Sequence, residues 1–150
     1  MQWMVHNLDE FESATNELFN EILRHKQTTG ATVVCLQGDL GAGKTTMTQI
    51  IARLLGVTDI VMSPTFVIKK TYTTQSDIFT KLVHMDAYRL EGEHLDTLRL
   101  SDDFTQNNTL MIIEWPEIIE SILPVDAIRV TINHVDSGRT IILESNKKNA

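Results

Sequence analysis

Residues 38–46 read Gly38-Asp39-Leu40-Gly41-Ala42-Gly43-Lys44-Thr45-Thr46. They fit the pattern G-x-x-x-x-G-K-[ST], the P-loop or Walker A pattern. In such a loop glycines permit backbone angles that other residues resist, and backbone N–H groups converge with the positive end of the next helix on phosphate oxygens. Lys44 is expected to reach the β- and γ-phosphates, and the Thr45 hydroxyl to ligate Mg²⁺. The whole segment is therefore predicted to bind a nucleoside triphosphate.

The sequence on either side supports this prediction. Residues 31–37 form a short apolar, β-branched run, which is typical of a buried strand. Residues 45–55 carry apolar side chains at helical spacing and end at Gly56, a common helix stop. A chance match in a glycine-containing turn would not require a strand before it and a helix after it.

Composition narrows the class of protein. The chain has 150 residues with 42% hydrophobic content, which suits a single domain over residues 1–150. A net charge of −7 disfavours a direct grip on a nucleic acid backbone, so any role with tRNA is expected to run through a protein partner. The single cysteine, Cys35, falls inside a predicted core strand and suits a reducing cytosol. We see no leader sequence and no apolar run near the ~20 residues that span a bilayer, so we expect a cytoplasmic protein without membrane association.

The N-terminal segment is predicted to form an edge strand at residues 3–6 and a helix over about residues 10–26, capped by Asn7 or Asp9. In many P-loop proteins the nucleotide base rests beside the first strand of the nucleotide-binding unit. Thr15 and its neighbours could line such a base pocket. An ordinary amphipathic helix start explains the same residues equally well.

A rigid Ser63-Pro64-Thr65 segment precedes a β-rich run. Pro64 prevents a helix and keeps Ser63 extended. With its hydroxyls, the segment could sense the γ-phosphate or the metal, as GTPase switch loops do, with Thr65 reporting the nucleotide state. A simple turn is the plainer alternative.

Two predicted strands end in an acid. The strand before Glu114 is wholly apolar, which gives the shape of a Walker B element and a central position. The strand before Asp86 carries Lys81 and His84, which predicts a less buried position. We assign Glu114 to Mg²⁺ and Asp86 to orienting the attacking water, and the reverse assignment stays open.

The fold class that follows is α/β, a P-loop NTPase fold with a mostly parallel central sheet, flanking helices and added antiparallel strands. Strands are predicted at residues 66–73, 79–85, 110–113, 127–134 and 139–145. A helix is predicted over residues 91–100, a turn or cap at 101–103 and a short helix or turn at 117–123. Asp136-Ser137-Gly138 indicates a hairpin between the last two strands.

Trp115 and Arg89 lie near the two acids in the sequence, and each allows two interpretations. Trp115 directly follows Glu114 and could fill the core or serve as an exposed docking aromatic. Arg89 could pair with an acid or stabilise phosphate charge, and structural pairing is the simpler expectation. No arginine finger is evident in the loops around the site.

Four blocks together resemble one family. They are GDLGAGKTT (38–46), SPTF (63–66), HMDAYRL (84–90) and IIEWPE (112–117). In this order they closely resemble the bacterial TsaE family, also called YjeE, small P-loop ATPases of tRNA threonylcarbamoyladenosine biosynthesis. Chain length and the final hairpin also fit.

The resemblance implies ATP rather than GTP, with Lys44 and Thr45 as phosphate and Mg²⁺ residues and Glu114 as a metal residue. It implies a catalytic role for Asp86, a switch-like Thr65 and a place for Trp115 on the functional face. In contrast to the four blocks, the Ser13-Ala14-Thr15 stretch matches the family's pattern only loosely. The resemblance also implies TsaD and TsaB as partners, which transfer the threonylcarbamoyl group while the ATPase drives or resets their complex.

Two other functions compete with a partner-stimulated ATPase. A small-molecule kinase would need a lid with clustered arginines, whereas the six arginines here are scattered along the chain. A GTPase switch would need an N-K-x-D guanine reader, and the one Asn-Lys pair, Asn146-Lys147, leads to Lys148-Asn149 at the chain end.

Overall fold

The computed structural model describes residues 1–64, 68–90 and 98–144. Its centre is a seven-stranded sheet in the order β1-β7-β6-β2-β5-β4-β3. The strands are β1 (Gln2–Val5), β2 (Thr32–Gln37), β3 (Lys69–Thr73), β4 (Lys81–Asp86), β5 (Thr109–Glu114), β6 (Ile128–Val135) and β7 (Gly138–Leu143). The four inner strands β6, β2, β5 and β4 are parallel, and β3, β7 and β1 add antiparallel edges. The predicted α/β class with a mostly parallel sheet is confirmed.

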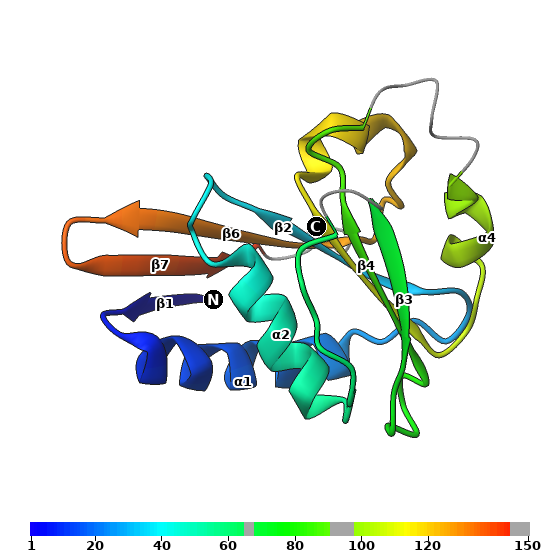
Figure 1. Cartoon of the computed structure of the whole chain (residues 1–150), viewed down its shortest axis with the longest axis horizontal. Coiled ribbons are helices and arrows are strands. Elements are labelled where there is room, and N and C mark those ends of the chain that lie inside the picture. Colours follow the sequence, from blue (N-terminus) through cyan, green and yellow to red (C-terminus); the bar gives the residue numbers. More distant parts are fainter. Residues whose placement is uncertain (65–67, 91–97, 145–150) are drawn as a thin grey trace.

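Two helices cover one face of the sheet (Figure 1). They are α1 (Leu8–Arg24) and α2 (Lys44–Leu54). The Asn7 side chain caps α1 by accepting from the backbone N–H of Glu10 at 2.9 Å, as one of the two predicted caps. Apolar side chains of both helices pack on the sheet residues that face them, among them Leu36 and Ile112. Because residues alternate between faces along a strand, Glu114 lies on the same face as Ile112.

The opposite face is covered by short elements, α4 (Leu100–Phe104) and the 3₁₀ helix η2 (Pro116–Ile122). Leu100 and Ile119 are buried there against Cys35 and the alternate residues of β4 and β5. Burial raises the pKa of the Cys35 thiol to about 12, which agrees with an inert core cysteine. The sheet therefore has one core on each face.

Several boundaries of helices and strands differ from the prediction. The turn predicted at 101–103 is wrong, because these residues belong to α4, whose Leu100 anchors it in the core. Strand β4 begins at Lys81 rather than at residue 79, and β3 begins at Lys69. The structure does not describe residues 65–67 and 91–97. Thr65, the predicted nucleotide sensor, and most of the helix predicted over residues 91–100 lie in these two segments.

The prediction that β4 is less buried is also wrong. His84 on this strand is completely buried, because its side chain lies on the face of the sheet that α1 and α2 cover, beside the core residues Leu82 and Ile112. Lys81 is only half-buried, and its ammonium contacts the side chain of Gln106. Lys81 and His84 did not indicate exposure of the whole strand. Lys81 lies at the strand end, and His84 has a buried partner, Glu114.

Candidate functional site

The P-loop lies between the end of β2 and the start of α2, at the carboxyl ends of the parallel strands. Two glycines are required by its geometry. A side chain at Gly38 would come within 2.6 Å of the backbone oxygen of Ile132. Gly43 has φ +117°, and a side chain there would lie 3.0 Å from the ring of Phe11. A side chain at either position would therefore strain this loop conformation.

Lys44 is buried within its own loop, with 5% of its surface exposed. Its ammonium donates to the backbone oxygens of Gly38 and Asp39, the latter at 2.9 Å. It also lies 4.5 Å from the centre of the Trp115 ring, a cation–π contact. Burial lowers the pKa of Lys44, while nearby carboxylates, led by Glu114, act in the opposite direction. An anionic group beside this ammonium would relieve the cost of burying it.

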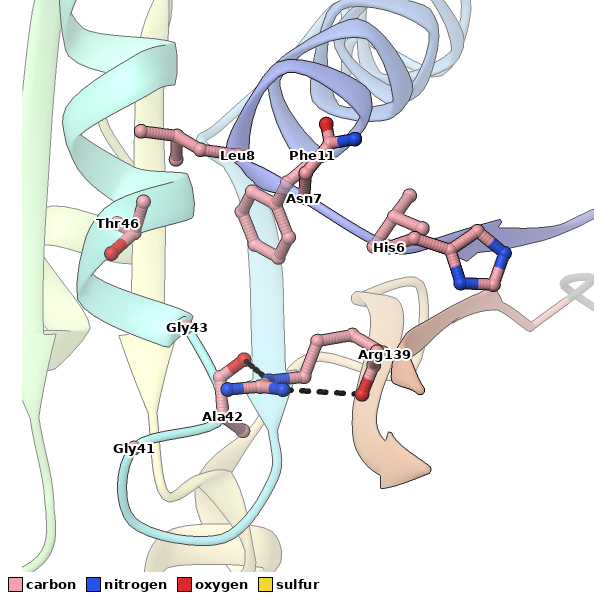
Figure 2. A pocket seen from close by; sticks show the side chains of 11 residues that line it. His6, Asn7, Leu8, Phe11, Gly41, Ala42, Gly43, Thr46 and Arg139 are labelled. Carbon is pink, nitrogen blue, oxygen red and sulfur yellow. Dashed lines mark hydrogen bonds between the residues drawn. The ribbon is translucent and has the colours of Figure 1, made fainter. Parts of the chain in front are cut away.

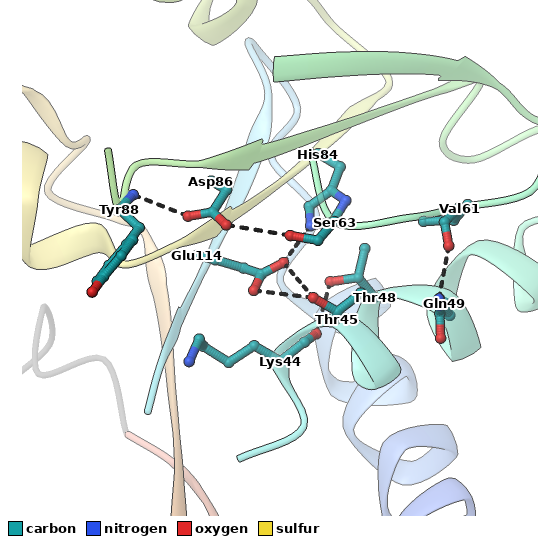
Figure 3. Close-up of polar contacts among 10 residues, drawn as sticks. All are labelled: Lys44, Thr45, Thr48, Gln49, Val61, Ser63, His84, Asp86, Tyr88 and Glu114. Carbon is teal, nitrogen blue, oxygen red and sulfur yellow. Dashed lines mark hydrogen bonds and ion pairs between the residues drawn. The ribbon is translucent and has the colours of Figure 1, made fainter. Parts of the chain in front are cut away.

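Thr45 and Glu114 face each other across the site (Figure 3). The Thr45 hydroxyl lies 3.4 and 3.3 Å from the two carboxylate oxygens of Glu114, which is 3% exposed. Hydroxyl and carboxylate oxygens are the ligands that Mg²⁺ prefers, and Mg²⁺ in nucleotide sites takes only one or two from protein. The described residues contain no cluster of three metal-binding side chains, so a metal here would need nucleotide oxygens as well. The donor set fits Mg²⁺ bound with a nucleotide.

Asp86 lies beside Glu114, since the two are paired in the register of β4 and β5. Its carboxylate accepts from the backbone N–H of Tyr88 at 2.9 Å and from the Ser63 hydroxyl at 3.4 Å. Its backbone N–H donates to the oxygen of Ile68. Of the two acids, Glu114 is the one that contacts Thr45, and Asp86 is more exposed. Both acids lie at the edge of a cavity of about 490 Å³ that the P-loop also lines.

The close contact between His84 and Glu114 was not foreseen. His84 Nε2 lies 2.5 Å from one carboxylate oxygen of Glu114. Strand alternation places His84 and Asp86 on one face, which is a signal that the sequence carries. The register of β4 on β5, which brings this face to Glu114, is a tertiary feature.

Trp115 is half-buried, so it is neither a fully buried core residue nor a fully exposed docking aromatic. Its ring lies 4.9 Å from that of Tyr88 and packs against the core under η2. Its φ is +58°, which is unusual for a bulky residue and places strain directly after Glu114. The ring thus forms one wall of the cavity, beneath the Lys44 ammonium.

Two expectations about the surroundings need correction. Thr15 is completely buried, and its hydroxyl donates to the Phe11 oxygen at 2.8 Å, so it presents no surface to a base. Arg89 lines the cavity beside the P-loop, so an arginine does lie next to the site. This position suits the second interpretation of Arg89, stabilisation of phosphate charge, which stays a prediction.

A second cavity, of about 330 Å³, lies on the other side of the P-loop (Figure 2). Its walls include Leu8 and Phe11 from the start of α1 and Ala42 from the loop. Arg139 of β7 closes it, and its guanidinium donates to the Ala42 oxygen at 3.2 Å. The sequence suggested a base pocket lined by Thr15 and its neighbours, and this cavity has Phe11, one helical turn before Thr15, in its wall.

The family model for "Threonylcarbamoyl adenosine biosynthesis protein TsaE" matches residues 8–141. The chain belongs to the TsaE family. It is 45% identical to the TsaE protein of Bacillus subtilis over 110 residues, 73% of this chain and 66% of that protein. It is 36% identical to TsaE of Haemophilus influenzae over 137 residues, 90% of this chain and 84% of that protein.

A solved structure agrees with this membership of the TsaE family. The crystal structure of Bacillus subtilis YdiB superposes with a TM-score of 0.70 at 31% identity, covering 95% of this chain and 83% of that one. The P-loop NTPase fold is thus confirmed. The family is named for tRNA threonylcarbamoyladenosine biosynthesis. Among the described helices, none is long and apolar enough to cross a membrane.

Proposed function

We propose that this TsaE-family protein is a Mg²⁺-dependent ATPase that acts with TsaD and TsaB in threonylcarbamoyladenosine modification of tRNA. The observation that carries the proposal is the Thr45 hydroxyl facing both oxygens of Glu114 beside the buried ammonium of Lys44. These are the parts that a P-loop uses on a β,γ-phosphate and its metal. Bound Mg²⁺ supplies neutralisation of charge on the phosphate oxygens.

The residues of the chain would share the chemistry as follows. The ammonium of Lys44 leaves the oxygens of Gly38 and Asp39 for the phosphates, where its charge is matched. Glu114 and Thr45 hold the metal. Asp86, held by the Tyr88 amide and the Ser63 hydroxyl, orients the attacking water. Thr65 as a nucleotide sensor stays a prediction.

The exposed apolar side chains at the rim of the cavity that contains Asp86 and Glu114 support docking of a protein partner there. Leu40 and Tyr88 line it with 69% and 48% of their surfaces exposed, and the half-buried Trp115 lies beside them. Exposed apolar side chains at a catalytic cavity suit a partner surface that excludes water when it docks. A cytoplasmic site of action, with tRNA held by TsaD and TsaB rather than by this acidic chain, completes the proposal.

The partner dependence is tested by an ATPase assay with and without purified TsaD and TsaB. We expect the isolated chain to turn over far below the ~10 s⁻¹ that is typical of dedicated enzymes, and the partners to raise the rate at least about tenfold. The Lys44→Ala variant, mixed with the same partners, is the control for contaminating activity. An isolated rate near ~10 s⁻¹ would show that the partners are not needed for turnover.

The smaller cavity is proposed as the base pocket, and it favours adenine. Its walls combine the Phe11 ring and other apolar side chains with polar ones, and the described residues that line it include no carboxylate to bind the guanine edge. A kinase remains the alternative. Against it, the two arginines near the P-loop, Arg89 and Arg139, line different cavities and do not form one cluster over the phosphate site. Arg24 and Arg129 are paired with Glu21 and Glu120.

Nucleotide preference is expected to appear in thermal melts. Mg²⁺-ATP at a hundred times its Kd should add about 2.7 kcal/mol to the free energy of unfolding. For a chain of this size that is a rise of roughly 5–10 °C in Tm. Differential scanning fluorimetry with ATP and GTP at equal concentrations measures it, with AMP as a control that lacks the β- and γ-phosphates. A larger shift with GTP would contradict the adenine assignment.

A further inference from the structure

His84 is a buried polar residue that has no role in the ATPase chemistry proposed above. It lies on β4, between β5 and the edge strand β3, and has no exposed surface. Its Nε2 lies 2.5 Å from Oε2 of Glu114 (Figure 3). Because an ionised carboxylate only accepts, the imidazole donates through Nε2–H. The same oxygen of Glu114 lies 3.3 Å from the Thr45 hydroxyl, and its other oxygen Oε1 lies 3.4 Å from that hydroxyl, so His84 and Thr45 both contact this carboxylate.

The other ring nitrogen indicates that His84 is not an ordinary core residue. Its Nδ1 is buried and has no hydrogen-bond partner among the described residues. Leaving a buried polar atom unpaired is costly, and most such atoms in proteins are paired. Its neighbours on the same face of the sheet, Leu82 and Ile112, are apolar and buried, so an apolar side chain at position 84 would avoid this cost. Within residues 1–64, 68–90 and 98–144, the contact with Glu114 is the hydrogen bond of the His84 side chain that offsets this cost.

We infer that His84 is a positioning residue that fixes the carboxylate of Glu114 toward Thr45, so that Mg²⁺ arriving with a nucleotide meets a preset ligand. The inference rests on the proposed function. A carboxylate held at one oxygen loses its freedom to rotate before the metal binds, which lowers the cost of binding. Removing such a supporting hydrogen bond typically weakens metal affinity 10–100-fold.

The test compares His84→Gln with His84→Asn. The Gln amide nitrogen reaches about as far as Nε2 and can still donate to Glu114, whereas the shorter Asn amide reaches only about as far as Nδ1. Isothermal titration with adenylyl imidodiphosphate, in Mg²⁺ and in EDTA, gives the ratio of the two affinities for each protein. We expect His84→Gln to keep the wild-type ratio within about threefold and His84→Asn to lower it 10–100-fold, with the affinity in EDTA nearly unchanged.

Circular dichroism and thermal melts establish that each variant is folded, and His84→Leu, which fills the space without a donor, repeats the test if His84→Asn is not. A wild-type ratio in a folded Asn or Leu variant overturns the inference. Equal losses in the Gln and Asn variants also overturn it, as does unfolding of every variant without the donor, because His84 is then structural. If the wild-type protein itself binds equally well in Mg²⁺ and EDTA, the proposed Mg²⁺ site fails instead.

Discussion

Lys44→Ala is expected to lower the affinity for ATP about 100-fold or more, because charge-assisted hydrogen bonds contribute about 1.5–3 kcal/mol each and the ammonium would make more than one to the phosphates. Isothermal titration with Mg²⁺-ATP measures the loss. The ligand-free fold is expected to survive. Burial lowers the pKa of Lys44, so the charged form costs the folded state free energy that the variant no longer bears.

The control for Lys44→Ala is Lys70→Ala. Lys70 is an exposed lysine on the edge strand β3, where its ammonium lies over the Tyr72 ring and away from the P-loop. Removing it changes net charge by the same amount, so a general electrostatic effect would appear in both variants. If the two variants bind ATP equally well, Lys44 does not contact the phosphates and the assigned P-loop role is wrong.

Asp86→Asn is expected to reduce ATP hydrolysis 10²–10⁴-fold, the usual contribution of a positioned acid–base group. The amide keeps the size of the side chain and its acceptor for the Tyr88 N–H, so the fold and Mg²⁺-ATP binding should remain within a few-fold of wild type. Single-turnover hydrolysis with saturating TsaD and TsaB measures the rate, and titration measures the affinity.

The matched variant is Glu114→Gln, which removes the other acid at the same level of the sheet. It is expected to weaken Mg²⁺-dependent nucleotide binding, since its carboxylate faces the Thr45 hydroxyl. The two variants together separate the two roles. Should Asp86→Asn lose the Mg²⁺ dependence of binding while Glu114→Gln loses only hydrolysis, the two acids have the opposite roles.

The sequence by itself was sufficient for the fold class and the central loop. Local patterns carry these features: the glycine spacing from Gly38 to Gly43, the apolar run that became β2, and the helical spacing of α2 are all short-range. The two strand-end acids were also readable, because a carboxylate after an apolar run marks the carboxyl end of a strand whatever the neighbouring strands are.

Tertiary structure alone decided which residues surround these acids. The register of β4 on β5 places Asp86 level with Glu114 and brings His84 within reach of it. Tertiary packing also buries Thr15 on the inner side of α1 and places Arg89 at the cavity. Register and burial depend on segments distant in sequence, so a histidine that looked like a sign of exposure is in fact completely buried, and its partner Glu114 is 30 positions away.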